Sequence, residues 1–260
     1  MIPPFLHSSV VRYIRGPNHP SKIRLLFLLQ HWLAGISCPL RPEIFMQLDF
    51  ADILGRELLM GHSHEPLTLK LIERLLVPGD VFVDIGANIG YFSLLAAQRV
   101  GTGGRVFSFE PNPAAVEKLR RNFALNPTLR AEIVAAAVSD TSGEVRLVQP
   151  DPWNLGGVRI DSLGSIAVRC APLVTLAPAL LDHPVQLVKI DVEGHEASVL
   201  RGLFAVPEFR PRNIIFEFKP THFAIADAES EFWQPLRAAG YVLRTVEGLP
   251  PGREIPEHNV

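Results

Sequence analysis

Short, almost continuously apolar runs alternate with amphipathic segments along most of the chain from Glu65 onward. Such runs are typical of strands buried on both faces of a sheet, and strands joined by helices form a parallel sheet covered on both sides. The pattern therefore predicts one doubly wound α/β domain. The expected strands are Val81–Asp84, Arg105–Glu110, Ala131–Val138, Gly143–Val148, Ile166–Val174, Val185–Asp191, Asn213–Lys219 and Tyr241–Val246, and the expected helices are Tyr91–Val100, Ala114–Leu125, Glu196–Leu203 and Glu229–Ala239.

Residues 1–47 form a separate, helical N-terminal extension in this interpretation, and residues 48–260 form the main domain. Ser21 is a candidate N-cap, and prolines at 39 and 42 mark the boundary. Apolar residues recur behind this cap at helical spacing, at Leu25, Leu26, Leu29, Trp32, Leu33 and Ile36. The extension is also basic, and so two interpretations remain. We favour a helix that docks on the main domain over one that lies on an anionic membrane surface.

Composition narrows the class of protein. The 260 residues are 47% apolar and 20% charged, which is typical of a globular chain. A formal net charge of −2 argues against a nucleic-acid partner. Cys38 and Cys170 are too few for a disulfide framework. No secretion signal or membrane-spanning run is evident, so we expect a cytoplasmic location; the sequence leaves the oligomeric state open.

The segment Asp84–Gly90 lies where the first expected strand turns into its helix. Ligands of open α/β sheets bind at the carboxyl ends of the strands, so this turn is the first candidate site. Gly86 and Gly90 allow a ligand to approach the backbone, and Asn88 tolerates left-handed geometry. The run is not G-x-G-x-x-G, which counts against a dinucleotide.

A carboxylate follows the next strand, at Glu110, 26 positions after Asp84. A carboxylate there can accept hydrogen bonds from both ribose hydroxyls of a nucleoside. No cluster of Lys or Arg accompanies the turn, so a nucleoside without phosphates fits better than a pyrophosphate.

Five ionisable side chains gather at the end of a later buried strand, in the run Lys189–Glu196. Buried charges are costly unless they are paired, so chance placement there is improbable. Glu193 and Glu196 could instead favour the positive end of the following helix, an alternative that applies least to Asp191.

Together these residues resemble the FkbM-like family of S-adenosylmethionine-dependent methyltransferases. The resemblance extends from roughly Asp49 to Tyr241. It rests on Gly61–Glu65, Pro78–Asp80, Asp84–Gly90 with Tyr91, Glu110–Asn112, Ala137–Asp140 with Gly143, and Lys189–Glu196. The resemblance implies a Rossmann-like class I methyltransferase fold and S-adenosylmethionine as the cofactor.

The resemblance also implies roles for individual residues. The cofactor-binding set would be Glu65, Asp84, Gly86, Asn88, Gly90, Glu110, Asn112, Ser139, Asp140 and Asp191. Asp84 to Gly90 would hold the methionine part, Glu110 the ribose, and Ser139 with Asp140 would lie near the adenine. Asp191, Glu193 and His195 are the candidate catalytic residues, with Asp191 close to the transferable methyl group.

We therefore expect an enzyme that moves the methyl group of S-adenosylmethionine to a hydroxyl oxygen of a small molecule or glycan. His195 is a candidate general base, because an imidazole can be neutral near pH 7; a capping or surface histidine is the alternative. No metal site is expected, although a divalent metal between Asp191, Glu217 and the acceptor is a rival mechanism. A non-catalytic nucleoside-binding module and, less favoured, an NAD-dependent oxidoreductase are the alternative functions.

Overall fold

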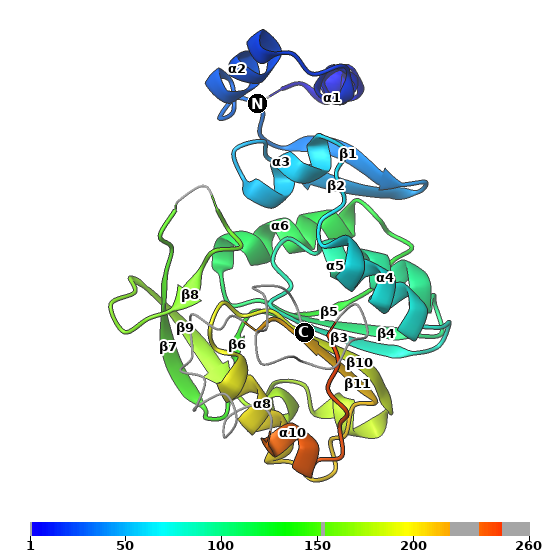
Figure 1. Ribbon diagram of the computed structural model, residues 1–260, viewed down its shortest axis with the longest axis vertical. Helices are drawn as coiled ribbons and strands as arrows, with labels where there is room; N and C mark the ends of the chain where they lie inside the picture. Colours follow the sequence, from blue (N-terminus) through cyan, green and yellow to red (C-terminus); the bar gives the residue numbers. More distant parts are fainter. Residues whose placement is uncertain (1, 152–153, 219–233, 246–260) are drawn as a thin grey trace.

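A five-stranded parallel sheet forms the centre of the molecule (Figure 1). The structure is a computed structural model that describes residues 2–151, 154–218 and 234–245. The strand order is β11 (Asn213–Phe216), β10 (Val185–Ile190), β3 (Val81–Ile85), β4 (Arg105–Phe109) and β5 (Glu132–Val134). The chain order reverses beside β3, so the crevice at the carboxyl ends of β3 and β10 is where a ligand is expected in such a sheet.

Helices cover both faces of this sheet, as the sequence pattern predicts. On one face lie α4 (Pro66–Leu75), α5 (Tyr91–Val100) and α6 (Pro113–Ala124), and on the other lie α8 (Glu196–Phe204), α10 (Gln234–Ala238) and the short α7 (Leu173–Leu176) and η2 (Pro178–Asp182) (Figure 1). Two hydrophobic clusters, one on each face, hold these layers together. The prediction of a doubly wound α/β fold is therefore confirmed.

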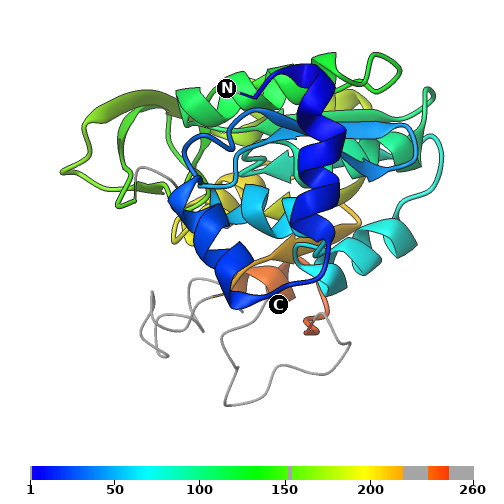
Figure 2. The same cartoon turned by 90° about the horizontal axis from the view of Figure 1, so that it is seen from above.

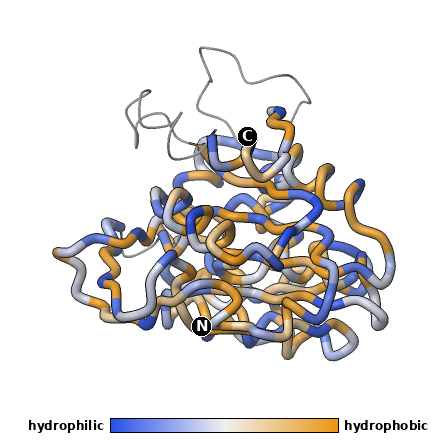
Figure 3. Tube along the Cα trace, turned by 90° about the horizontal axis from the view of Figure 1, so that it is seen from below, coloured by the Kyte–Doolittle hydropathy of each residue, from blue (hydrophilic) through white to orange (hydrophobic). Residues whose placement is uncertain are grey.

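A second, four-stranded sheet projects from the side of the domain, in the order β6 (Ala137–Val138), β9 (Ile166–Ala171), β7 (Gly143–Val148), β8 (Arg159–Ile160). Hydrophilic and hydrophobic segments follow one another along this arm (Figure 3), and polar and apolar residues alternate in β7 from Glu144 to Leu147. The segment expected as one strand over Ala131–Val138 is divided between the two sheets. Its first half pairs with β4 and its second half with β9.

The N-terminal region contains more than the helix that its spacing indicates. It runs through η1 (Pro4–Leu6), α1 (His7–Arg15), α2 (Pro20–Leu28), the antiparallel hairpin of β1 (Ile36–Arg41) and β2 (Ile44–Leu48), and α3 (Ile53–Leu59). The expectation of one helix as far as Ile36 is wrong, because α2 ends at Leu28. The N-cap is the His19 ring, which accepts from the Lys22 amide at 3.2 Å, and not Ser21.

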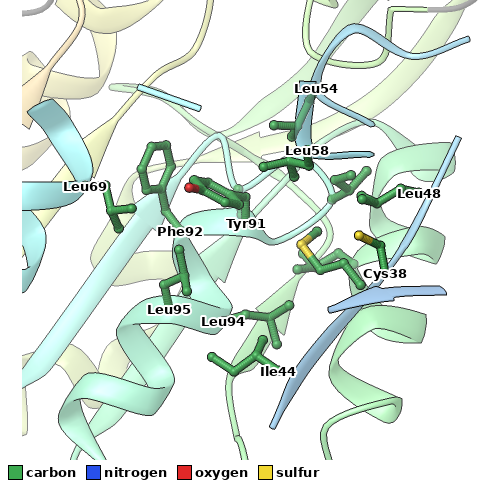
Figure 4. Close-up of a cluster of buried hydrophobic side chains, with 14 of the residues drawn as sticks. Cys38, Ile44, Leu48, Leu54, Leu58, Leu69, Tyr91, Phe92, Leu94 and Leu95 are labelled. Carbon is green, nitrogen blue, oxygen red and sulfur yellow. The ribbon is translucent and has the colours of Figure 1, made fainter. Parts of the chain in front are cut away.

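The hairpin packs against the main domain. Figure 4 shows Cys38, Ile44 and Leu48 in one cluster with Leu94 and Leu95 of α5. The expected boundary between residues 47 and 48 falls inside β2, so side chains from both sides of it share this core. The division into two units stays a prediction.

Two asparagines, one in the last turn of α6 and one just after this helix, bind the backbone of β2. Asn126 accepts from the Phe45 amide at 2.9 Å and donates to the Phe45 carbonyl at 2.7 Å. Asn122 accepts from the Gln47 amide at 2.8 Å and donates to the Ile89 carbonyl at 2.8 Å. The free edge of β2 is thus satisfied by side chains in place of another strand.

The last expected strand is absent in the described residues. Residues 241–245 have no strand, and the Tyr241 hydroxyl instead donates to the Pro211 carbonyl at 2.5 Å. Residue 246 and the first part of the helix expected over Glu229–Ala239 lie outside the described residues.

Candidate cofactor and active site

The turn after β3 is built by three residues in left-handed conformations, Gly86 (φ +85), Asn88 (φ +49) and Gly90 (φ +95). The amides of Gly86 and Ala87 donate to the Phe109 carbonyl at 2.9 and 3.0 Å. A Cβ on Gly86 would lie 1.7 Å from the Asp191 carbonyl oxygen, so only glycine lets β3 and β10 end this close together. The turn is therefore fixed to both neighbouring strands.

Glu110 fastens the same turn from the end of β4. Its carboxylate accepts from the Asn88 amide and from the Asn112 amide, both at 2.8 Å. The side chain is almost fully buried. Burial raises the pKa of Glu110 to about 7, although the two amide hydrogen bonds favour the charged form. A carboxylate oxygen has further lone pairs, so these bonds leave acceptor capacity for ribose hydroxyls.

A buried lysine links two carboxylates beneath the turn. The Nζ of Lys189 lies 3.1 Å from Asp191 Oδ2 and 3.8 Å from Asp84 Oδ1, and Ser93 donates to Asp84 Oδ2 at 2.6 Å. Burial opposes the charged form of Lys189, but the carboxylates around it outweigh burial and raise its pKa. Burial also raises the pKa of Asp84. Asp84 therefore supports the turn from the interior, a role that its place in the sequence does not reveal.

Glu65 belongs to the same electrostatic cluster. It precedes α4 with a left-handed backbone (φ +40), and His64 Nε2 lies 3.3 Å from its Oε1. Burial opposes ionisation, but the His64 hydrogen bond and the charge of Lys189 lower the pKa of Glu65 to about 2. The predicted role of Glu65 in cofactor binding stays a prediction.

His195 is held at the start of α8 by Ser139. Its Nε2 lies 3.0 Å from Ser139 Oγ, which donates to Asp140 Oδ1 at 3.2 Å. Arg201 Nε donates to Asp140 Oδ2 at 2.9 Å. Burial lowers the pKa of His195, so its imidazole is neutral at pH 7.

Three carboxylates lie close together at the ends of β10 and β11. Ligand oxygens of Asp191, Glu193 and Glu217 lie within 4.8 Å of one another among the described residues. Glu193 takes a left-handed conformation (φ +51) at this turn. Glu196 has a different role, because it accepts from the amides of Gly194 and Val192 at 3.1 and 3.2 Å and so holds the turn.

A pocket lies at the carboxyl ends of β3, β4 and β10. Six of the predicted residues line it: Gly86, Asn88, Glu110, Asp191, Glu193 and His195. The other predicted residues do not reach its wall in the described structure. Asp84, Gly90 and Asn112 are buried beside it, and Ser139 and Asp140 follow the lining residues of β6. Glu65 precedes α4, which contributes no lining residue. The assigned roles of all these residues stay predictions.

One wall of the pocket was not predicted. Leu155, Gly156, Val158 and Ile160 contribute it, from the loop and strand between β7 and β9. The Leu155 amide donates to Asp52 Oδ2 at 3.1 Å, which ties this loop to α3. No periodicity marks these residues in the sequence, so the only signal is their apolar character inside a polar loop.

The pocket fits a polar, nucleoside-like cofactor. Three buried side-chain atoms have no hydrogen-bond partner in the described residues: Asp84 Oδ1, Asn88 Oδ1 and Asn112 Nδ2. Buried polar atoms are nearly always paired. Asp84 Oδ1 faces the Lys189 ammonium at 3.8 Å, whereas Asn88 lines the pocket, so its oxygen points to a partner supplied by a ligand or by water. All three belong to the cofactor-binding set that the resemblance implies.

A family model described as Methyltransferase FkbM domain matches residues 84–243. The chain belongs to the FkbM methyltransferase family. This membership confirms the expected resemblance and assigns S-adenosylmethionine as the cofactor, which the described pocket residues fit.

Several known methyltransferases are similar to this chain. The chain is 39% identical over 184 residues to the 31-O-demethyl-FK506 methyltransferase FkbM of Streptomyces tacrolimicus, covering 58% of this chain and 70% of that protein. It is 30% identical over 125 residues to the hexuronic acid methyltransferase AglP of Haloferax volcanii, covering 48% of this chain and half of AglP. A solved TehB-like methyltransferase of Corynebacterium glutamicum aligns with a TM-score of 0.42 at 11% identity, covering 77% of this chain and 88% of that one.

Proposed function

We propose that this FkbM-family protein transfers the methyl group of S-adenosylmethionine to a hydroxyl oxygen of a small molecule or glycan. The carrying observation is that Asp191 and His195 both line the pocket that contains the glycine turn and Glu110. A cofactor bound by the turn and Glu110 would thus share one space with a carboxylate and a neutral imidazole. The names of two relatives, which act on a hexuronic acid and on 31-O-demethyl-FK506, support an oxygen-rich acceptor.

The bound cofactor supplies an electrophilic methyl group, and the protein must position the acceptor and remove its proton. An aliphatic hydroxyl is a poor nucleophile, so a base that takes the proton as the methyl arrives accelerates transfer. The Ser139 proton is directed to Asp140, so Ser139 Oγ can accept from a proton on His195 Nε2. The basic lone pair of His195 then lies on Nδ1, while Asp191 orients the acceptor.

The test is turnover of S-adenosylmethionine labelled in its methyl group, first against a panel of hydroxylated sugars, uronic acids and macrocycles. His195→Ala should lower turnover by about 100-fold or more and leave cofactor affinity nearly unchanged. His183→Ala, at a half-buried histidine that does not line the pocket, is the matched control.

Three outcomes would overturn this assignment. Cofactor binding without transfer to any hydroxylated acceptor would favour a nucleoside-binding module. Tighter binding of NAD than of S-adenosylhomocysteine would favour an oxidoreductase. Full activity of His195→Ala that EDTA abolishes and magnesium restores would replace the base by a metal at Asp191, Glu193 and Glu217.

A further inference from the structure

Helix α2 presents a row of large apolar side chains to solvent. Leu25, Leu28, Leu29 and Trp32 follow one another at i, i+3, i+4 and i+7, through α2 and the turn after it, and are 43%, 79%, 40% and 69% exposed. Leu26 and Leu33 take the buried side. The helical spacing of these apolar residues therefore forms two faces of α2 and the turn after it. One face packs on the protein, and the other is exposed in the described structure.

Exposed apolar side chains concentrate in this part of the molecule. Sixteen large apolar side chains are exposed among the described residues, and eight of them lie within residues 5–32. The eight are Phe5, Leu6, Tyr13, Leu25, Phe27, Leu28, Leu29 and Trp32. Helices α1 and α2, which carry four of them, lie in front of the rest of the fold when it is seen from above (Figure 2). Scattered apolar residues are ordinary on a surface, but such a concentration marks a binding face.

The same region carries only positive charge. The first carboxylate of the chain is Glu43, and the preceding 42 residues contain five Lys or Arg. The remaining residues contain 20 Lys or Arg against 27 Asp or Glu, so the rest of the chain is acidic. Three of the basic side chains are engaged internally. Lys22 Nζ donates to the Ile14 carbonyl at 2.8 Å, Arg15 Nη2 donates to the Leu58 carbonyl at 3.1 Å, and Arg41 pairs with Glu73. Arg12 and Arg24 are exposed.

These features select an anionic lipid surface as the partner. Leucine and tryptophan beside arginine are typical of helices that lie in the headgroup region, where arginine stems reach toward lipid phosphates. Two copies of a region with five positive charges and no carboxylate would repel each other. In the described part of the chain no helix is long and apolar enough to cross a bilayer, so the contact would be peripheral.

We propose that Arg24, Leu25, Leu28, Leu29 and Trp32, here called the α2 surface, bind the face of an anionic membrane. The acidic remainder of the chain is repelled by such a membrane, which orients the protein with α1 and α2 toward the lipid. This surface is separate from the pocket residues, so its function does not depend on the identity of the methyl acceptor.

The experiment is flotation of the full-length chain with vesicles of phosphatidylcholine containing about 30% phosphatidylglycerol, compared with pure phosphatidylcholine. The wild-type chain should float with the anionic vesicles at 0.05 M salt and much less at 0.5 M. Leu28→Ser with Trp32→Ser should weaken partitioning at least tenfold. Arg12→Gln with Arg24→Gln should weaken it by roughly fivefold for each charge.

Leu163→Ser is the matched control, because Leu163 is 89% exposed in the turn between β8 and β9 and should leave partitioning unchanged. The side chains changed in the test variants are exposed, so these variants should bind the cofactor with the same affinity as the wild type. Equal flotation of the wild type and the Leu28/Trp32 variant, or no flotation with anionic vesicles, would overturn the proposal. A dimer in sedimentation without lipid that the Leu28/Trp32 variant dissolves would assign the α2 surface to a second copy of this chain.

Discussion

Cofactor affinity should depend on pH through Glu110. Its carboxylate is buried with a pKa raised to about 7 from an ordinary value of 4.5, and ribose hydroxyls can donate two hydrogen bonds only to the ionised form. About one tenth of the group is ionised at pH 6 and about nine tenths at pH 8. The dissociation constant of S-adenosylhomocysteine should therefore fall by roughly tenfold between these pH values and level off above pH 8.

The raised pKa of Glu110 should affect folding stability in the opposite direction to cofactor affinity. A carboxyl group whose pKa is higher in the folded than in the unfolded state binds more protons when folded, so it lowers stability as pH rises from about 4.5 to about 7. The shift corresponds to about 3 kcal/mol at most. Affinity and stability should thus move in opposite directions over this pH range.

Calorimetric titration of S-adenosylhomocysteine at pH 6, 7 and 8 measures the affinity, and Glu110→Gln is the control. Glutamine does not titrate, so its affinity should be independent of pH and weaker than that of the wild type at pH 8. Glu110→Ala also removes the acceptors of the Asn88 and Asn112 amides and should weaken binding by roughly 30-fold to 1000-fold. An unchanged wild-type affinity between pH 6 and 8, or the same slope in Glu110→Gln, would refute the ribose assignment.

Two further substitutions test the support of the site. Lys189→Met should lower the free energy of unfolding in urea by about 3–5 kcal/mol, because it leaves the buried carboxylates of Asp84 and Asp191 without their cation. Lys118→Met is the control: its pair with Asp49 is more exposed, so the loss should be no more than about 1 kcal/mol. Equal costs would contradict the linking role of Lys189. Gly86→Ala should abolish cofactor binding, because the new Cβ would collide with the Asp191 carbonyl oxygen. Gly79→Ala is the control: the backbone there is also left-handed (φ +94), but a Cβ would have no atom within 4 Å, so the loss should be only about 1–2 kcal/mol of stability. Normal binding by Gly86→Ala would contradict the close approach of β3 and β10.

The sheet could be predicted from the sequence because its strands are buried on both faces. β3 and β10 are largely apolar and carry a charged residue, Asp84 or Lys189, one position before their end, and the turns after them lie at one edge by topology alone. Residues 241–245 have the composition of a strand, yet they form none, since pairing depends on neighbours that a local pattern does not contain.

The candidate site could be predicted only in part, because a local pattern does not show contacts between distant residues. Residue types and spacing identify Glu110 and Asp191 as polar groups at strand ends. They do not show that Asp84 faces inward to Lys189, or that Leu155 folds over from the second sheet. Those placements follow from contacts between residues far apart in the chain.

The Asn122 side chain joins two segments that have no sequence similarity. It accepts from the Gln47 amide in the hairpin and donates to the Ile89 carbonyl in the cofactor turn. A lineage that altered the edge of the hairpin and replaced this asparagine would at the same time remove a donor from the turn. The N-terminal hairpin and the cofactor turn therefore share one side chain, and a graft of either segment should keep asparagine at position 122, because both of its bonds are to backbone groups.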